Sequence, residues 1–289
     1  MGQKDISEKI LLDYNDVFAD IVNVCAFQGE EFVKEEDLER ASVYAEYKAE
    51  DSELHEEERD VAKYWKIQNT AIALFGIENQ STIEKNMPFR IIGYDGAAYR
   101  SQLLEKRKKI VPVVSFVLYF GTRKRWNKNK SIKELMHIPM GLDEYINDYK
   151  INVIEVAWLS EHQLKMFKSD FGIVANYFVQ KRKNKDYVPD DKREIQHVDA
   201  VLKLLSVMTG DKRYGRILSG NDERCEVNTM CEVVDRLVNM GKSEGLREGE
   251  SAERIRIIKS MQKKGMSLQE ISELLELSIE KVEELIDKK

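Results

Sequence analysis

The sequence predicts an α/β protein in which a mixed central sheet is flanked by helices and followed by an α-helical C-terminal region. Two observations lead to this prediction. Strand-like runs alternate with helical patterns as far as about residue 160, and beyond it the patterns are helical only. This order is typical of an α/β core with a helical extension. We expect a core over 1–185, a helical extension over 186–240, and a charged linker with a small helix-turn-helix-like tail over 241–289.

The first predicted elements are two helices and a hairpin. Apolar residues at spacings of three and four predict an amphipathic helix over 8–23, and an acidic stretch predicts a second helix over 36–50. Residues 59–65 and 70–78 resemble short strands joined by a polar link, which predicts a β-hairpin. We expect these two strands to lie side by side.

A helix, the strongest strand signal of the chain and a series of helices follow. The spacing of apolar residues after Pro88 predicts a helix over 89–108. The run 111–120 predicts a strand, and Pro112 is tolerated at its start because no main-chain donor is needed there. The remaining expected elements are a short helix over 131–136, a strand over 151–158, and helices over 160–179, 192–208 and 225–240.

The tail combines a glycine-rich segment with three short helices. Gly241, Gly245 and Gly249 recur every four residues, and each costs a helix about 1 kcal/mol relative to alanine. We therefore expect a weakly formed helix or a linker there. Helices are predicted over 255–264, 267–275 and 278–286, and Ser267 with Glu270 matches a capping box at the start of the second.

Composition and charge limit the class of protein. A hydrophobic fraction of 42%, a charged fraction of 34% and a mean hydropathy of -0.50 are typical of a soluble folded protein. The net charge of -6 argues against binding nucleic acid through global charge, although basic residues cluster locally. We find no apolar run long enough to span a membrane and no signal-peptide core. Three cysteines match neither a disulfide framework nor a zinc site, which favours a reducing compartment such as the cytoplasm.

Two acids on the predicted hairpin could form a metal site. Asp60 would open one strand, while Glu78 and Gln80 would share a face of the next, because alternate strand side chains point the same way. Two carboxylates and a polar side chain on neighbouring strands can hold a hard divalent cation against a phosphate. The alternative is that Asp60 caps a strand end and Glu78 is a solvated residue at a strand edge. Spacing alone favours this alternative.

Several short runs, taken in their order and spacing, resemble a known family. They are Asp16–Asp20, Arg59–Val61, Gly76–Gln80, Met87–Arg90 with Tyr94–Asp95, and Pro112–Val114 leading into Leu118–Gly121. Together they resemble the Rpn family of recombination-promoting nucleases, also labelled PD-(D/E)XK nuclease family transposases. The resemblance is close over residues 5–158 and looser in the tail.

The resemblance implies a restriction-endonuclease-like core and Mg²⁺-dependent cleavage of DNA with little sequence specificity. Asp60 matches the motif aspartate, and Glu78 with Gln80 matches the acid-X-lysine element, although glutamine replaces the usual lysine. Asp60 and Glu78 would hold Mg²⁺, the carbonyl of Asn79 would add a ligand, and Gln80 would orient water. Asp16, with Asp20 as the alternative, matches the first-helix acid, yet Asp16 could equally be a solvated residue on the polar face of its helix.

Basic residues near this motif are candidates for contact with DNA. Arg90 and Tyr94 lie one turn apart and could contact phosphate, although Arg90 could instead pair with Glu84. A second group lies in one basic loop, where Trp126 is expected to pack on the sheet: Arg123, Lys124, Arg125 and Lys128.

The terminal helices and the missing lysine leave two questions about function open. The helices over 267–286 resemble a helix-turn-helix, but their acidic residues would face phosphate with the wrong sign, so a helical cap or an oligomerisation module is an alternative. We expect a homo-oligomer that binds DNA and is not inserted into a membrane. The alternative to an active nuclease is an inactive nuclease-fold remnant that binds DNA or associates with itself.

Overall fold

The computed structural model describes most of the chain. The described residues are 9–41, 44–48, 54–58, 60–68, 70–105, 109–219 and 227–287. The chain divides into two compact units, Met1–Val233 and Val234–Lys289, which we call the first and the second unit. The boundaries expected at 185 and 240 stay predictions. None of the described helices is long and apolar enough to cross a membrane.

The described strands of the first unit form a mixed sheet in the order β1-β4-β5-β6-β7. The strands are β1 (Leu38–Arg40), β4 (Val61–Ile67), β5 (Thr70–Gln80), β6 (Val113–Tyr119) and β7 (Asn152–Glu155). The first three pair antiparallel, whereas β6 runs parallel to β5 and β7 parallel to β6. Parallel strands need a crossover, and α3 (Met87–Leu104) supplies it between β5 and β6. The predicted α/β class is confirmed.

The predicted helix over 36–50 is wrong. Its described residues form a 3₁₀ turn, η1 (Glu35–Asp37), then β1 and then β2 (Tyr44–Lys48). Strand β2 pairs antiparallel with β3 (Leu54–Glu58) in a separate two-stranded sheet. The physical reason is long-range pairing, because β1 joins the edge of the main sheet through the register of Leu38 with Trp65. The rest of that predicted helix lies outside the described residues.

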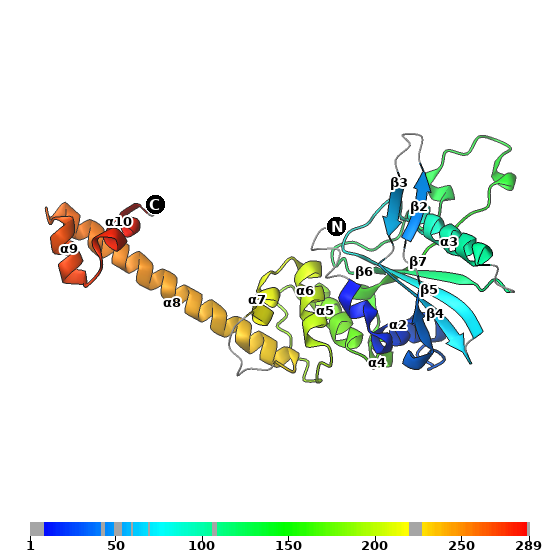
Figure 1. The fold of residues 1–289 in the computed structure, drawn as a ribbon, viewed down its shortest axis with the longest axis horizontal. Helices are drawn as coiled ribbons and strands as arrows, with labels where there is room; N and C mark the ends of the chain where they lie inside the picture. The colour runs from blue at the N-terminus through cyan, green and yellow to red at the C-terminus, as the bar shows by residue number, and fades with distance from the viewer. Residues whose placement is uncertain are drawn as a thin grey trace. The chain divides into compact units, whose positions relative to one another are not determined.

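Two helices cover opposite faces of the sheet (Figure 1). Helix α2 (Asn15–Phe27) follows a short helical stretch over 9–13, so the helix predicted over 8–23 is interrupted at Tyr14. Helix α3 covers the other face, and its first turn contains Pro88, which has no main-chain donor to leave unsatisfied. We call these the α2 face and the α3 face.

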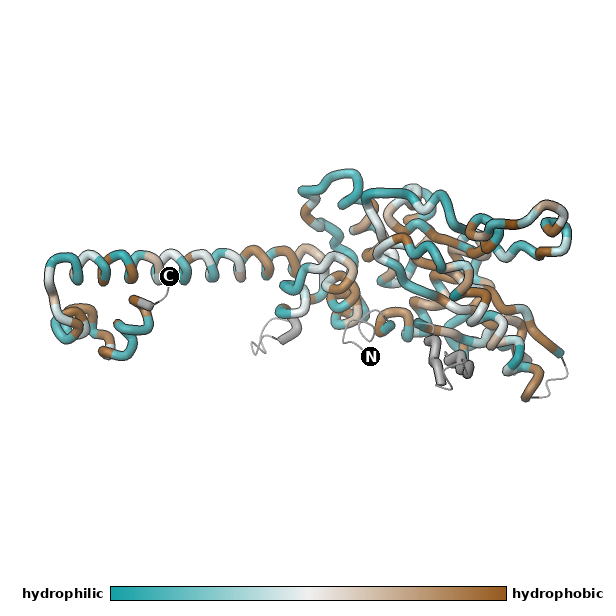
Figure 2. The backbone as a smooth tube through the Cα atoms, turned by 90° about the horizontal axis from the view of Figure 1, so that it is seen from above, coloured by the Kyte–Doolittle hydropathy of each residue, from teal (hydrophilic) through white to brown (hydrophobic). Residues whose placement is uncertain are grey.

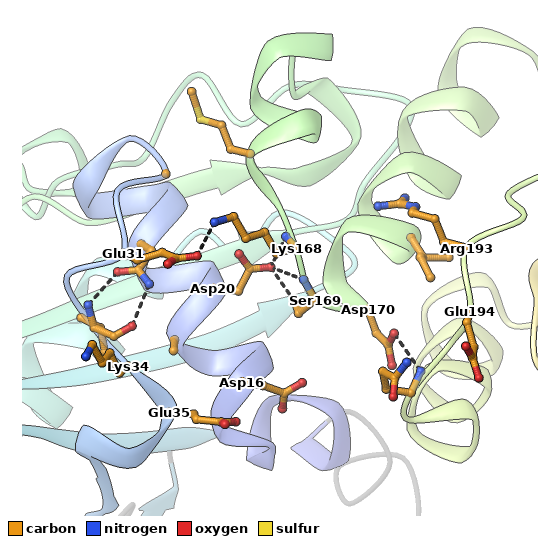
Figure 3. A pocket seen from close by; sticks show the side chains of 17 residues that line it. Asp16, Asp20, Glu31, Lys34, Glu35, Lys168, Ser169, Asp170, Arg193 and Glu194 are labelled. Atoms are coloured by element: carbon orange, nitrogen blue, oxygen red, sulfur yellow. Dashed lines mark hydrogen bonds and ion pairs between the residues drawn. The ribbon is translucent and has the colours of Figure 1, made fainter.

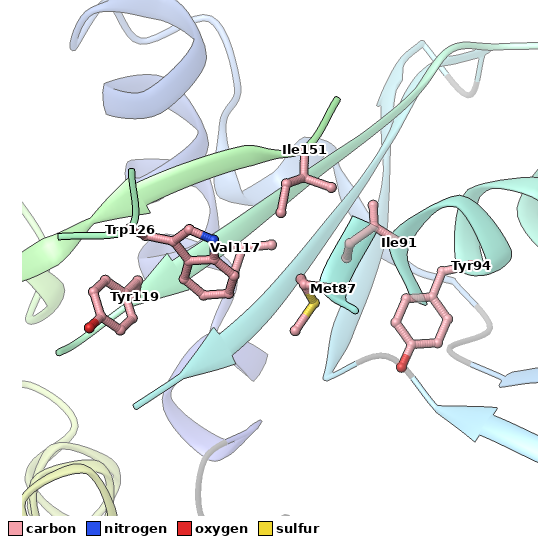
Figure 4. Packing of buried hydrophobic residues seen from close by; sticks show 7 residues of the cluster. All are labelled: Met87, Ile91, Tyr94, Val117, Tyr119, Trp126 and Ile151. Atoms are coloured by element: carbon pink, nitrogen blue, oxygen red, sulfur yellow. The ribbon is translucent and has the colours of Figure 1, made fainter. Parts of the chain in front are cut away.

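Side chains from α3, β6 and the loop after β6 fill the core of the α3 face. Figure 4 shows them: Met87, Ile91, Tyr94, Val117, Tyr119, Trp126 and Ile151. Brown, hydrophobic segments gather in the strands and packed helices of the first unit (Figure 2). Trp126 is fully buried and meets Tyr119 edge to face at 5.4 Å, so its predicted packing on the sheet is confirmed. The core therefore fixes α3 and the start of the basic loop relative to β5 and β6.

Helices complete the first unit. The expected strand over 151–158 is shorter, because β7 is followed by a 3₁₀ turn, η4 (Val156–Trp158). The expected helix over 160–179 is split in two around residues 167–170. The helices are α4 (Glu161–Met166), α5 (Phe171–Lys183), α6 (Val198–Thr209) and α7 (Arg213–Ser219).

The second unit has its own core. Helix α8 (Met230–Lys263) leads into α9 (Leu268–Leu275) and α10 (Ile279–Asp287). Ile258, Ile271, Val282 and Leu285 pack together in this core. The capping box at the start of α9 is confirmed, since Ser267 Oγ accepts from Glu270 N and the Glu270 carboxylate accepts from Ser267 N at 2.7 Å.

The glycine-rich segment is helical throughout, so of the two expected structures, a weak helix or a linker, the helix is found. Residues 241–250 lie within the 34-residue helix α8, and all of them are exposed. Helix α8 carries buried residues near its start, at Met230 and Val233, and near its end, at Ile258. Helix formation is cooperative, so the packed helical turns at the two ends of α8 favour a helical conformation in the glycine-rich segment between them. Figure 2 shows the start of α8 as hydrophobic and its middle as largely hydrophilic.

Candidate active site

The two predicted acids lie opposite each other on neighbouring strands. Asp60 directly precedes β4, and Val61 is paired with Ile77, so Asp60 stands across from Glu78. Glu78 and Gln80 are two residues apart near the end of β5 and therefore share the α3 face. The sequence had predicted this juxtaposition, and the structure brings the residues together.

Main-chain hydrogen bonds tie the two acids to one another. Asp60 N donates to Glu78 Oε2 at 3.3 Å, and Asn79 N donates to Asp60 Oδ2 at 2.7 Å. The Asn79 side chain faces the opposite side of the strand and is buried. Asn79 could thus contact an ion on the α3 face only through its main chain, as predicted. Gln80 is half-buried, and its carbonyl accepts from Phe120 N at 2.8 Å.

Arg90 on α3 is the charged partner of Glu78. Its Nη2 lies 2.6 Å from Glu78 Oε1 and 2.9 Å from the Tyr94 hydroxyl. Glu78 is only 2% exposed, so the ion pair is shielded from solvent on the acid's side. Burial would lower the pKa of Arg90, but Glu78, Tyr94 and Asp60 outweigh it and raise that pKa. Arg90 therefore pairs with Glu78 and not with Glu84, the partner considered from the sequence.

Asp16 is held by a different partner, and its expected role as a metal ligand stays a prediction. Its carboxylate oxygens lie 3.0 and 3.1 Å from His197 Nε2, and the His197 ring stacks on Tyr14 at 3.6 Å. Among the described residues, no group of three His, Cys, Asp or Glu side chains gathers as metal ligands would. The Asp16 side chain meets the segment that starts α6, a long-range contact that no local sequence pattern predicts.

A polar pocket of about 490 Å³ lies beside α2 and the start of α5 (Figure 3). Asp16, Asp20, Lys168, Asp170 and Arg193 are among the described residues that line it, and Asp60, Glu78 and Arg90 are not. Two of its acids, Asp20 and Asp170, accept hydrogen bonds from the main chain of other segments. Asp20 accepts from Lys168 N at 3.0 Å and from Ser169 N at 2.8 Å; burial nevertheless raises the Asp20 pKa.

The basic loop begins at the same edge of the sheet as the two acids. Strand β6 pairs Tyr119 with Gln80, so the loop that follows β6 leaves from the end of β5 that carries Glu78. Its four candidate side chains are all exposed: Arg123, Lys124, Arg125 and Lys128. Arg125 Nε lies 3.4 Å from Glu155 Oε2, and its guanidinium is 5.0 Å from the Trp158 ring centre.

A buried lysine on β4 is a feature that sequence reasoning missed. Lys63 is fully buried, and its Nζ donates to Asp13 O at 2.7 Å and to Asn15 Oδ1 at 2.6 Å. Burial lowers the Lys63 pKa to about 8. Because Lys63 is in register with Phe75 and lies 5.0 Å from the Phe18 ring of α2, it faces away from Glu78. It therefore does not replace the lysine missing at position 80.

A protein-family model matches most of the first unit, including the sheet and the candidate site. The family model described as "Putative transposase, YhgA-like" matches residues 28–203. The chain belongs to this family. The YhgA-like transposases are part of the Rpn and PD-(D/E)XK group, so the predicted resemblance and the restriction-endonuclease-like core with an α-helical C-terminal region are confirmed. No curated protein and no solved structure matches the chain significantly.

The matched part of the chain contains the candidate site. It includes Asp60, Glu78, Arg90 and the basic loop, whereas Asp16 precedes it. Mg²⁺ binds proteins through one or two carboxylates and keeps several waters for exchange with phosphate oxygens. The adjacent carboxylates of Asp60 and Glu78 fit that donor set. Arg90 holds one of the Glu78 oxygens, so it would compete with the ion for this acid.

Proposed function

We propose that this protein is a Mg²⁺-dependent endonuclease that hydrolyses DNA phosphodiester bonds with little sequence specificity and promotes recombination. One observation carries the proposal: Asp60 and Glu78 lie together on the α3 face at the end of β5. The exposed basic loop leaves the sheet at the same edge and supports an interaction with DNA there.

In this proposal the carboxylates of Asp60 and Glu78, with the carbonyl of Asn79, hold Mg²⁺. The bound ion would neutralise phosphate charge and lower the pKa of a water. Gln80 shares the face of Glu78 and orients that water through its amide, which can donate and accept hydrogen bonds. A neutral amide does not accept a proton at ordinary pH, so Gln80 positions water and is not a general base.

The basic loop would contact the DNA backbone without reading sequence. Exposed arginine and lysine side chains bind phosphates through charge, and such binding weakens as salt rises. The overall charge of -6 opposes DNA elsewhere on the chain. DNA would therefore be held near the loop formed by Arg123, Lys124, Arg125 and Lys128.

An inactive remnant is the second candidate function. The observations that favour it are the glutamine at position 80 and the ion pair that already occupies Glu78. In that case the protein binds DNA or associates with itself and does not cut. Binding of DNA by the wild-type protein without cleavage in Mg²⁺ would support this candidate.

The test is a plasmid-nicking assay in Mg²⁺ or in EDTA. Asp60→Ala and Glu78→Ala are compared with wild type and with Glu161→Ala, which changes an acid that is 77% exposed on α4. We expect cleavage only with Mg²⁺ and a loss of about 100-fold or more in the first two variants, as for other groups that stabilise transition-state charge. Circular dichroism checks that each variant is folded. Undiminished Mg²⁺-dependent cleavage in both would show that the site is wrong.

A further inference from the structure

The ion pair between Arg90 and Glu78 blocks the metal position that the proposed function requires. Glu78 Oε1 faces Arg90 Nη2 at 2.6 Å, and Glu78 Oε2 accepts from Asp60 N at 3.3 Å. Both carboxylate oxygens thus have donors. Since Glu78 is 2% exposed, solvent cannot replace the arginine as its partner, and a buried charge without a partner is unfavourable. Arg90 therefore stabilises Glu78 in the absence of a metal ion.

A metal ion and the Arg90 guanidinium cannot share Glu78 Oε1 without strong repulsion between two cations. Metal binding to this acid therefore requires Arg90 to leave it. Arg90 is able to move, because its side chain is 36% exposed while that of Glu78 is 3% exposed. It lies in the first turns of α3, and the Tyr94 hydroxyl at 2.9 Å provides an acceptor that does not depend on Glu78.

The displaced guanidinium would be suited to phosphate. Arginine presents donors in a planar fork that binds phosphate oxygens in pairs, and it keeps its charge at any ordinary pH. The raised pKa of Arg90 agrees with a cation held among anionic groups. Residue 80, beside Glu78 on the same face of β5, is a neutral glutamine. Arg90 would then supply the positive charge that residue 80 lacks.

We propose that Arg90 is an exchangeable counter-ion: it neutralises Glu78 until Mg²⁺ binds, and it then releases Glu78 and holds a DNA phosphate. The inference rests on the proposed function, because it assumes that Mg²⁺ binds Glu78. It assigns Arg90 a positioning role toward phosphate and makes the binding of Mg²⁺ and of DNA mutually favourable. A purely structural ion pair would instead remain in place when Mg²⁺ is added.

The experiment measures Mg²⁺ binding to the full chain without DNA by isothermal titration calorimetry. Arg90→Gln removes the competing charge, and we expect Mg²⁺ to bind about 10-fold more tightly, within the usual range of coupling between two binding events. Plasmid nicking by the same variant should fall about 10-fold or more. Arg90→Lys keeps a charge and should retain near wild-type Mg²⁺ affinity. Arg100→Gln, an exposed position on the same helix, should leave Mg²⁺ affinity unchanged.

A measurement on the wild-type chain covers the case in which Arg90→Gln does not fold. The side-chain Nε–H signal of Arg90, assigned with Arg90→Lys, should shift in the NMR spectrum as Mg²⁺ is added. An unmoved signal at saturating Mg²⁺, or unchanged or weaker Mg²⁺ binding by Arg90→Gln, would overturn the inference while leaving the nuclease proposal intact. Wild-type protein that neither binds Mg²⁺ nor cuts DNA would overturn both.

Discussion

Acids on the two faces of the sheet differ in the kind of partner that holds them. On the α3 face, Glu78 is held by the side chain of Arg90 at 2.6 Å. On the α2 face, Asp20 accepts hydrogen bonds from the main-chain N–H groups of Lys168 and Ser169 and from the Ser169 hydroxyl. Asp170 accepts from Gln196 N and His197 N at 3.1 and 2.6 Å. Both faces therefore contain shielded carboxylates, but of these three acids Glu78 is the one in a direct ion pair with a long cationic side chain.

This difference separates structural acids from candidates for function. A carboxylate that accepts main-chain N–H groups fixes a turn or the start of a helix, so releasing it loosens the chain. A carboxylate paired with a long side chain can exchange that partner for a metal ion with little movement of the backbone. Asp60 is closer to the first kind, since its carboxylate accepts from Asn79 N, although its charge also acts on Arg90 and raises the pKa of that side chain. Burial of an acid alone therefore does not identify a site.

The largest effect on stability is expected from Asp170→Ala. Asp170 is 3% exposed, and its loss leaves two main-chain donors at the start of α6 without their acceptor. We expect the free energy of unfolding to fall by about 2 to 4 kcal/mol, given about 1 to 2 kcal/mol for each donor. Denaturant unfolding measures this loss. Cleavage per folded molecule should stay at the wild-type level.

Asp199→Ala is the matched control on α6, since its side chain is 72% exposed. It should change the free energy of unfolding by less than about 0.5 kcal/mol, as is usual for exposed positions. If Asp170→Ala is as stable as this control, the assignment of the acids on the α2 face to structure is wrong.

The next effect is a pH dependence that arises from Lys63 on the α2 face. Burial lowers its folded-state pKa to about 8 from the ordinary value of 10.5. Above pH 8 the folded protein releases a proton that the unfolded chain keeps, so stability rises with pH until the unfolded lysine also titrates. We expect the free energy of unfolding to increase by about 2 kcal/mol between pH 8 and pH 10 from this group alone.

Denaturant unfolding at several pH values between 7 and 10.5 measures this contribution as a difference between variants. The rise should be absent in Lys63→Met and present in Lys66→Met, which changes a more exposed lysine of the same strand. Equal slopes for wild type and Lys63→Met would mean that burial does not lower the pKa of Lys63. The contacts of the Lys63 ammonium with Asp13 and Asn15, which stabilise the cation, would then fully offset the cost of its burial.

Local patterns predicted those elements whose structure depends on neighbours in the sequence. The hairpin of β4 and β5, helix α3 and strand β6 follow from alternation, apolar spacing and the position of Pro88. The helix expected over 36–50 failed because β1 exists through pairing with β4, about 25 residues away. Helix α8 was underestimated because the penalty of its glycines is local, whereas helix formation depends on its whole length.

In the candidate site too, local contacts were predictable from the sequence and long-range contacts were not. The pairing of Asp60 with Glu78 follows from the register of a hairpin, so the sequence was sufficient for it. The partner of Arg90 was not predictable, because it depends on how α3 packs across β5. Lys63 did leave a signal that could have been used, since a lysine at an inward position of the apolar run 61–65 must be buried or distort the strand.

The smallest effect is expected from Asp16→Asn, and it tests the comparison most directly. Asp16 contacts His197 at 3.0 Å on the α2 side, and this pair is partly exposed, at 38% for Asp16 and 19% for His197. Such a pair contributes about 0 to 1 kcal/mol to stability. Because the contact does not involve Asp60 or Glu78, we expect Mg²⁺ affinity and plasmid nicking to stay within about twofold of wild type. Such a change is well below the tenfold loss of affinity that corresponds to about 1.4 kcal/mol. A loss of Mg²⁺ affinity as large as that of Glu78→Ala would make Asp16 a metal ligand, and the division between a structural and a functional face would fail.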